Sequence, residues 1–128
     1  MASDEIESLL NRIGNELARD TEYPLDGTFL YAEAGPSVVG TSIFKDLGDH
    51  LLFRISTGST DDLILDLWEA APTDKRWAAM QYRIEGGKFT AAFTYPEEFD
   101  PEESVRERRA RILQQRYGNK RVVYPSLD

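Results

Sequence analysis

The chain has 128 residues, no cysteine and a formal net charge of −8. Its length predicts a single domain over residues 1–128, with a core that needs neither disulfides nor metals. The lack of cysteine excludes thiolate catalysis and cysteine zinc sites, and it fits the reducing cytoplasm. No signal-peptide pattern and no apolar run of membrane-spanning length is found, so we expect a cytoplasmic protein without a membrane partner.

The charge is unevenly spread along the chain. Residues 1–66 carry 13 acids and 4 bases, a net −9, whereas residues 67–128 carry 10 acids and 11 bases, a net +1. An acidic half repels the phosphate backbone of nucleic acid and attracts a basic partner. We therefore expect a protein partner and no nucleic acid. A simpler interpretation is that the acids only keep the protein soluble.

The first half predicts one helix followed by three strands. Residues 4–20 carry apolar side chains at helical spacing, with Asp4 and Glu7 as a capping box and Gly14 as a weak point. The three β-branched and aromatic runs that follow are separated by short turns, which is typical of an antiparallel meander. The predicted strands are residues 28–34, 38–44 and 51–56.

A second helix and a hairpin follow. Residues 59–71 have an apolar stripe, Thr60 as the predicted cap, and two acids in the first turn, where the helix dipole favours them. Pro72 ends this helix. Residues 77–85 and 88–95 alternate between apolar and polar side chains around Gly86-Gly87, which predicts a tight β-hairpin.

The segment from Asp100 to Pro125 predicts a C-terminal helix, followed at residues 122–124 by a short terminal strand or a packing arm. Asp100 is the expected cap, because Pro101 follows it and Glu103 lies three residues on. Gly118 is the expected stop. Ion pairs are predicted at four-residue spacing between Glu102 and Arg106 and between Glu107 and Arg111. The fold class is therefore α+β, with an N-terminal, a middle and a C-terminal helix packed on a mostly antiparallel sheet that contains the Gly-Gly hairpin.

Few residue patterns point to catalysis. His50 is the single histidine and has no predicted partner, and the phosphate-loop patterns GxxxxGK and GxGxxG do not occur. Asp62 and Asp66 share a helix face near Asp61, and this leaves a carboxylate and magnesium hydrolase as one alternative. Helix capping and a solvated face explain the same acids more simply. In the arginine cluster at residues 106–111, we expect one arginine to pair inward with an acid.

The C-terminal residues resemble a known family. The aromatic strand Phe89…Phe93-Thr94-Tyr95 is followed by a helix and its close, and together they are similar to the C-terminal signature of the YezG-like family of bacterial immunity and antitoxin proteins. The matching residues of the helix and its close are Arg108-Arg109, Ile112-Leu113, Arg116-Tyr117-Gly118-Asn119-Lys120 and Val123-Tyr124-Pro125. The resemblance implies a small α+β domain, no catalytic activity, no cofactor, and binding to a cognate toxin.

These observations lead to one hypothesis and two alternatives. We expect a non-enzymatic immunity protein that binds a toxin, with a basic nuclease as one candidate, through an acidic face. The candidate contacts are Asp61, Asp62, Asp66, Glu69, Glu97 and Glu98. The alternatives are an adaptor or chaperone-like module that binds by a sheet edge or an aromatic patch, and the carboxylate hydrolase. The sequence leaves the oligomeric state open.

Overall fold

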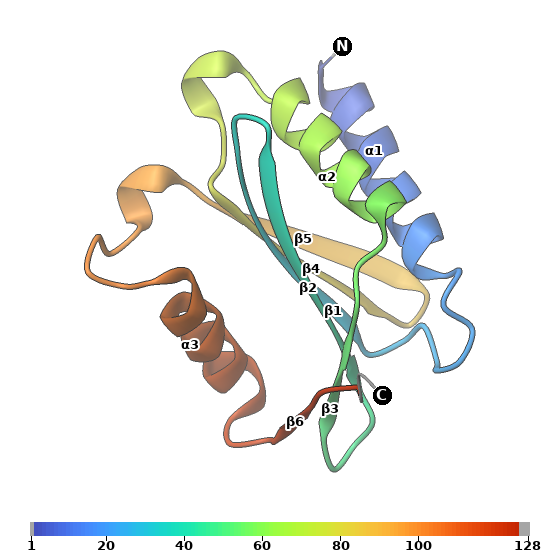
Figure 1. The fold of residues 1–128 in the computed structure, drawn as a ribbon. Helices are drawn as coiled ribbons and strands as arrows, with labels where there is room; N and C mark the ends of the chain where they lie inside the picture. Colours follow the sequence, from blue (N-terminus) through green and yellow to red (C-terminus); the bar gives the residue numbers. More distant parts are fainter. Residues whose placement is uncertain (1, 126–128) are drawn as a thin grey trace.

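The computed structural model describes the backbone of residues 2–125 and the side chains of residues 4–125. Three α-helices and six strands form an α+β fold, as predicted (Figure 1). The helices are α1 (Ala2–Leu17), α2 (Gly58–Ala70) and α3 (Val105–Tyr117), and two short 3₁₀ turns are η1 (Thr73–Lys75) and η2 (Pro96–Glu98). The strands are β1 (Thr28–Gly35), β2 (Val38–Asp46), β3 (Leu51–Arg54), β4 (Ala79–Glu85), β5 (Lys88–Thr94) and β6 (Val122–Val123).

The six strands form one sheet in the order β5-β4-β1-β2-β3-β6. The meander β1-β2-β3 is antiparallel, as predicted, and β4 joins it by pairing antiparallel with β1. The exception is β6, which pairs parallel with β3, with Leu51 opposite Val122. The C-terminal segment therefore completes one edge of the sheet, and β5 forms the other edge.

Helices cover both faces of the sheet. Because side chains alternate along a strand, Leu30 faces α1 and α2, whereas Phe29 and Tyr31 face α3. The first face packs against the buried stripe of α1, which includes Leu9, Ile13 and Leu17. The second face packs against Ile112, Leu113 and Tyr117 of α3. Figure 1 shows α1 and α2 side by side and antiparallel on one side of the sheet, with α3 on the other.

The Gly86-Gly87 turn has the geometry that its sequence predicts. Both residues have positive φ, at 60° and 74°, and Glu85 lies opposite Lys88 in the register. A two-residue hairpin needs positive φ at both central positions, which glycine adopts without a steric penalty. The turn is fixed further because the Asp26 carboxylate accepts hydrogen bonds from both glycine amides, at 3.0 and 3.1 Å.

The predicted start of the third helix is wrong. α3 begins at Val105, with Ser104 as its cap, and Ser104 and Glu107 form a reciprocal capping box. The Asp100 carboxylate instead accepts a hydrogen bond from the Glu102 amide in a local turn. Since Glu107 is used by the cap, its predicted pair with Arg111 does not form. The close at Gly118 is confirmed.

The predicted caps of the other two helices are also wrong. α2 is capped by Thr57, whose hydroxyl accepts from the Thr60 amide, and Thr60 itself is buried. With the extended Thr57 as its cap, the helix begins at Gly58, one residue before the predicted start at residue 59. Asp4 lies inside α1, which begins at Ala2, so the proposed capping box with Glu7 does not mark a helix start.

Candidate protein-binding surface

An acidic groove lies between the outward faces of α1 and α2. We call it the α1–α2 groove, and it consists of two adjoining hollows that share Arg12 and Asp66. Its charged lining residues are Glu5, Arg12 and Glu16 of α1 and Asp62, Asp66 and Glu69 of α2. Five carboxylates and one guanidinium give the groove a net charge of −4. Such a surface attracts a cationic partner.

Helical spacing brings these side chains together. Asp62, Asp66 and Glu69 are four and then three residues apart, so they project from one face of α2. Glu5, Arg12 and Glu16 are separated by seven and four residues, so they also share one face of α1. The antiparallel arrangement of the two helices then sets Glu5 near Glu69 and Glu16 near Asp62. The groove therefore carries acids at both ends and in its middle, where Arg12 and Asp66 line both hollows.

The acids on the outward face of α2 lower the stability of their own helix. Asp62 and Asp66 are like charges at four-residue spacing, which destabilises a helix by about 0.2–0.5 kcal/mol. Glu69 lies in the last turn of α2, where the helix dipole disfavours an acid and where no basic residue occurs. Among the described residues, no ion pair or hydrogen bond engages the side chains of Asp62, Asp66 or Glu69. These carboxylates are thus available to an external cation.

The other predicted contact residues lie elsewhere. The Asp61 carboxylate accepts a hydrogen bond from the Ser56 hydroxyl at 2.6 Å, so it supports the N-terminal turn of α2. The Glu98 carboxylate accepts from the Tyr95 amide at 3.1 Å and stabilises η2. Glu97 is exposed and lines a separate hollow with Trp68 and Tyr95. The structure thus brings together three of the six predicted acids.

Sequence reasoning missed Glu5, Arg12 and Glu16. Their spacing along α1 was a usable signal, because it puts them in one row along the flank of the apolar stripe. The sequence could not show that this face lies next to the acidic face of α2. That neighbourhood depends on the packing of both helices on one side of the sheet.

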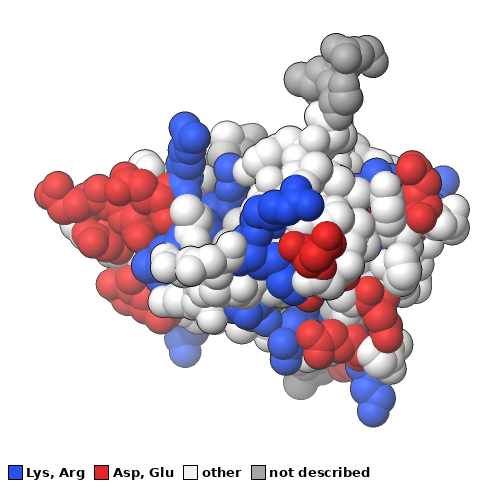
Figure 2. Space-filling model, turned by 90° about the horizontal axis from the view of Figure 1, so that it is seen from below, with Lys and Arg blue, Asp and Glu red and all other residues white. Residues whose placement is uncertain are grey.

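A second acidic region is visible at one end of the molecule. Figure 2 shows acidic side chains gathered at the left, on the side where Figure 1 has the connection between β5 and α3, with basic side chains beside them. Residues 97–103 contain five acids. One of them, Glu103, is held by Arg111 at 2.8 Å, and this hydrogen bond lowers the pKa of Glu103. This region is thus partly neutralised by α3.

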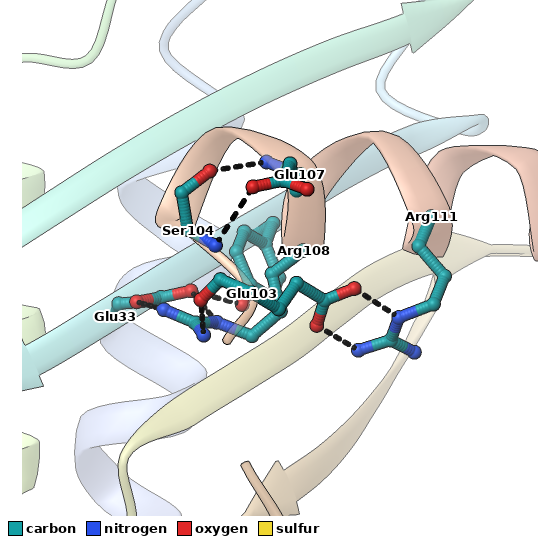
Figure 3. A network of polar contacts seen from close by, with 7 residues as sticks. Glu33, Glu103, Ser104, Glu107, Arg108 and Arg111 are labelled. Atoms are coloured by element: carbon teal, nitrogen blue, oxygen red, sulfur yellow. Dashed lines mark hydrogen bonds and ion pairs between the residues drawn. The ribbon is translucent and has the colours of Figure 1, made fainter. Parts of the chain in front are cut away.

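Most arginines of α3 make contacts within the protein. Arg108 pairs with Glu33 on β1, which confirms the expectation of one inward arginine (Figure 3). Arg109 donates to the Ser42 hydroxyl at 2.9 Å, and Arg111 pairs with Glu103. Arg106 is exposed. Three of the four arginines at residues 106–111 are therefore held by groups of the protein itself.

The residues considered for catalysis are dispersed. The His50 ring nitrogen Nδ1 lies 2.6 Å from the carboxylate of its neighbour Asp49, and this contact lowers the pKa of Asp49. Within residues 4–125, no three His, Asp or Glu side chains gather closely enough to hold a metal ion. In the same part of the chain, no helix has the length and apolar character needed to cross a membrane.

One lysine is buried beside a further hollow. Lys45 of β2 is 1% exposed, and its Nζ donates to the Thr28 hydroxyl at 2.8 Å and to the Pro24 carbonyl at 3.2 Å. Burial lowers the pKa of Lys45. These bonds tie the connection between α1 and β1 to the sheet, so Lys45 has a structural role.

Comparison with known proteins adds no relative: neither a protein-family model nor a curated protein matches the chain. The resemblance of the C-terminal residues to the YezG-like family therefore stays an expectation from the sequence.

Proposed function

We propose that this protein is a non-enzymatic immunity or antitoxin protein that binds a basic protein toxin through the α1–α2 groove. The observation that carries the proposal is the set of three unpaired carboxylates on α2, which are arranged against the stability of their own helix. Side chains that cost local stability and engage nothing within the described chain are typical of binding sites. The C-terminal resemblance to the YezG-like family supports the same function independently.

A nuclease is the toxin class that the groove fits best. The nucleic-acid-binding surface of a nuclease is basic because it contacts phosphates. A groove with carboxylates along two helices offers such a surface a row of negative charges in place of the phosphates. Binding would then cover the toxin's substrate-binding surface, and the net charge of −8 would speed the encounter.

The test is co-expression with the product of the neighbouring reading frame, as the candidate toxin. We expect the wild-type protein to restore growth and to bind the purified toxin with an affinity that falls as salt rises. The groove variant Asp62→Asn/Asp66→Asn/Glu69→Gln is expected to associate about tenfold more slowly or worse, because the attracting charges are gone. Stopped-flow or surface-based kinetics would measure this rate.

The matched control is Glu97→Gln/Glu98→Gln/Glu102→Gln, which removes the same number of carboxylates from exposed positions outside the groove. It is expected to change the association rate much less than the groove variant does. Equal loss in both variants would mean that only net charge matters. An affinity that is independent of salt would favour the alternative of an adaptor with an apolar contact.

A further inference from the structure

One edge of the sheet is open. β5 has seven residues and is the last strand on its side, and within residues 2–125 no strand pairs with its outer edge. The opposite edge is formed by β6, which has two residues and is followed closely by Pro125. A short strand next to proline protects an edge from pairing, whereas a long regular strand does not. β5 is therefore the edge on which another strand can be added.

The register shows which backbone groups of β5 point outward. Glu85 and Lys88 flank the two-residue turn, so they are a hydrogen-bonded pair of the hairpin. Because such pairs alternate along an antiparallel ladder, Phe89, Ala91 and Phe93 are the positions that do not bond to β4. Their amide N–H and C=O groups face away from the sheet. Three backbone N–H donors and three C=O acceptors can thus bond to an added strand.

The side chains of β5 offer little protection against pairing. Lys88 is its single charged residue, and the strand contains no proline. The centre of the strand is Ala91-Ala92, where the side chains are too small to block an approaching backbone. Phe89 and Phe93 are half-buried and lie on the face covered by α1 and α2. Natural sheets normally protect a strand of this kind, unless it is an interface.

The charges at the two ends of β5 are opposite. Lys88 begins the strand, and the exposed acid Glu97 follows shortly after its end. An antiparallel second copy of β5 brings the start of each strand to the end of the other. In a pairing centred on Ala91, Lys88 of each copy lies opposite the end of the other strand, three residues before Glu97 in the acidic turn that also contains Glu98. The opposite charges at the two ends therefore favour an identical, antiparallel strand as the occupant.

We propose that two copies of this chain pair through β5, antiparallel around Ala91, and form one continuous sheet of twelve strands. The self-complementary edge is what a two-fold symmetric dimer requires. Phe89 of one copy would lie next to Phe93 of the partner subunit on the helix-covered face, which extends the apolar surface across the contact. The α1–α2 groove of each copy lies on the outer side of its helices and is left open.

The first test is the molar mass in solution, by light scattering or sedimentation over a range of concentrations. The expected result is a concentration-dependent species of twice the 14.6 kDa mass of one chain. A monomer at every concentration overturns the proposal. In that case an added peptide strand or another protein would be the occupant of β5.

The second test identifies the edge. Ala91→Pro removes an outward N–H and leaves the bonds to β4 intact, since Ala91 does not donate to β4. Two hydrogen bonds are lost per dimer, so the dimer dissociation constant is expected to rise about 10- to 100-fold. A dimer that is as tight as the wild type in this variant overturns the proposal, provided that circular dichroism shows the same fold.

A charge exchange keeps the test decisive if Ala91→Pro fails to fold. Lys88→Glu is expected to weaken the dimer, and Lys88→Glu/Glu97→Lys to restore it, because the attraction between opposite charges at the ends of the two strands is rebuilt with reversed sign. Lys75→Glu is the matched control, since Lys75 is exposed on η1, outside β5. Weakening by Lys75→Glu equal to that by Lys88→Glu, or no restoration in the double variant, would contradict the β5 contact. The groove variant is expected to dimerise like the wild type, so this outcome is independent of toxin binding.

Discussion

Arg108 of α3 donates two hydrogen bonds to the carboxylate of Glu33 on β1, at 2.8 and 3.0 Å, across 75 positions of sequence. The two side chains are 9% and 15% exposed, so the ion pair is largely buried. A third bond joins the Arg108 guanidinium to the Glu103 carbonyl, and the Tyr31 hydroxyl also donates to Glu33. The Arg108 guanidinium lies 3.9 Å from the ring centre of Phe99. This network fastens α3 to its face of the sheet.

Replacing Arg108 is expected to be strongly destabilising. Arg108→Met would leave the Glu33 carboxylate buried without its cation, and such a loss costs about 3–5 kcal/mol of unfolding free energy. Urea denaturation would measure it. Arg106→Met is the control, because Arg106 is exposed on the same helix. Adding Glu33→Leu to Arg108→Met should recover part of the loss, and no recovery would show that packing rather than the unpaired charge dominates.

The start of α3 shows the limit of local sequence rules. Two capping patterns, Asp100…Glu103 and Ser104…Glu107, are four residues apart, and both satisfy the rule. The second is used because Glu103 has tertiary partners: its carbonyl accepts from Arg108 and its carboxylate from Arg111. Inside a helix, that carbonyl would bond to the amide of Glu107 instead. The choice thus depends on the contact between Arg108 and Glu33, which no local pattern contains.

The strands and the candidate groove also have features that local sequence patterns predict and features that they do not predict. Alternation along β1 and β4 and the Gly-Gly turn depend on neighbouring residues, so they were predictable. The acidic face of α2 was predictable as well, from the spacing of Asp62, Asp66 and Glu69. The acids that α1 adds to the groove, and the parallel pairing of β6 with β3, arise from contacts between distant segments. Periodicity within a single element carries no information about them.

The need for glycine at position 14 of α1 comes from a side chain of another element, Tyr82 of β4. A Cβ atom at Gly14 would lie 2.7 Å from the hydroxyl of Tyr82, which donates to the Leu10 carbonyl at 2.7 Å. Gly14→Ala is therefore expected to destabilise the protein by about 1–3 kcal/mol, because it displaces this buried hydroxyl. In a Tyr82→Phe background the same substitution should stabilise by up to about 1 kcal/mol, through helix propensity alone. A double-mutant cycle by urea denaturation measures the change of sign, and additive effects would contradict it.

The raised pKa of Tyr82 predicts a loss of stability at high pH. Burial raises the pKa of Tyr82 to about 12 in the folded protein, above its ordinary value of 10.0. A raised pKa stabilises the fold below pH 10, and this contribution is lost as the pH rises through 12. We expect Tyr82→Phe to lose less unfolding free energy than the wild type over this interval. Chemical denaturation at several alkaline pH values measures the difference, and parallel curves would exclude a role for Tyr82.

The lowered pKa of Asp20 predicts a loss of stability at low pH. Its carboxylate accepts two hydrogen bonds from Arg54 of β3, at 2.8 and 3.0 Å, and they lower the pKa of Asp20 below its ordinary value of 3.8. The pair joins the end of α1 to the sheet. A lowered pKa gives stability that is present above the ordinary value and is lost as the pH falls through the folded one.

Arg54→Met is therefore expected to lower the unfolding free energy at neutral pH and to flatten its decline as the pH falls through and below the ordinary pKa of an aspartate. The control is Arg19→Met, because Arg19 is 76% exposed and its contact with Glu16 is long, at 3.5 Å. That variant should follow the wild-type curve in acid. If Arg54→Met lost stability in acid as steeply as the wild type, other carboxylates would have to carry the acid dependence, and Asp46 is the first to examine, because its hydrogen bond from Lys120 likewise lowers the pKa of Asp46.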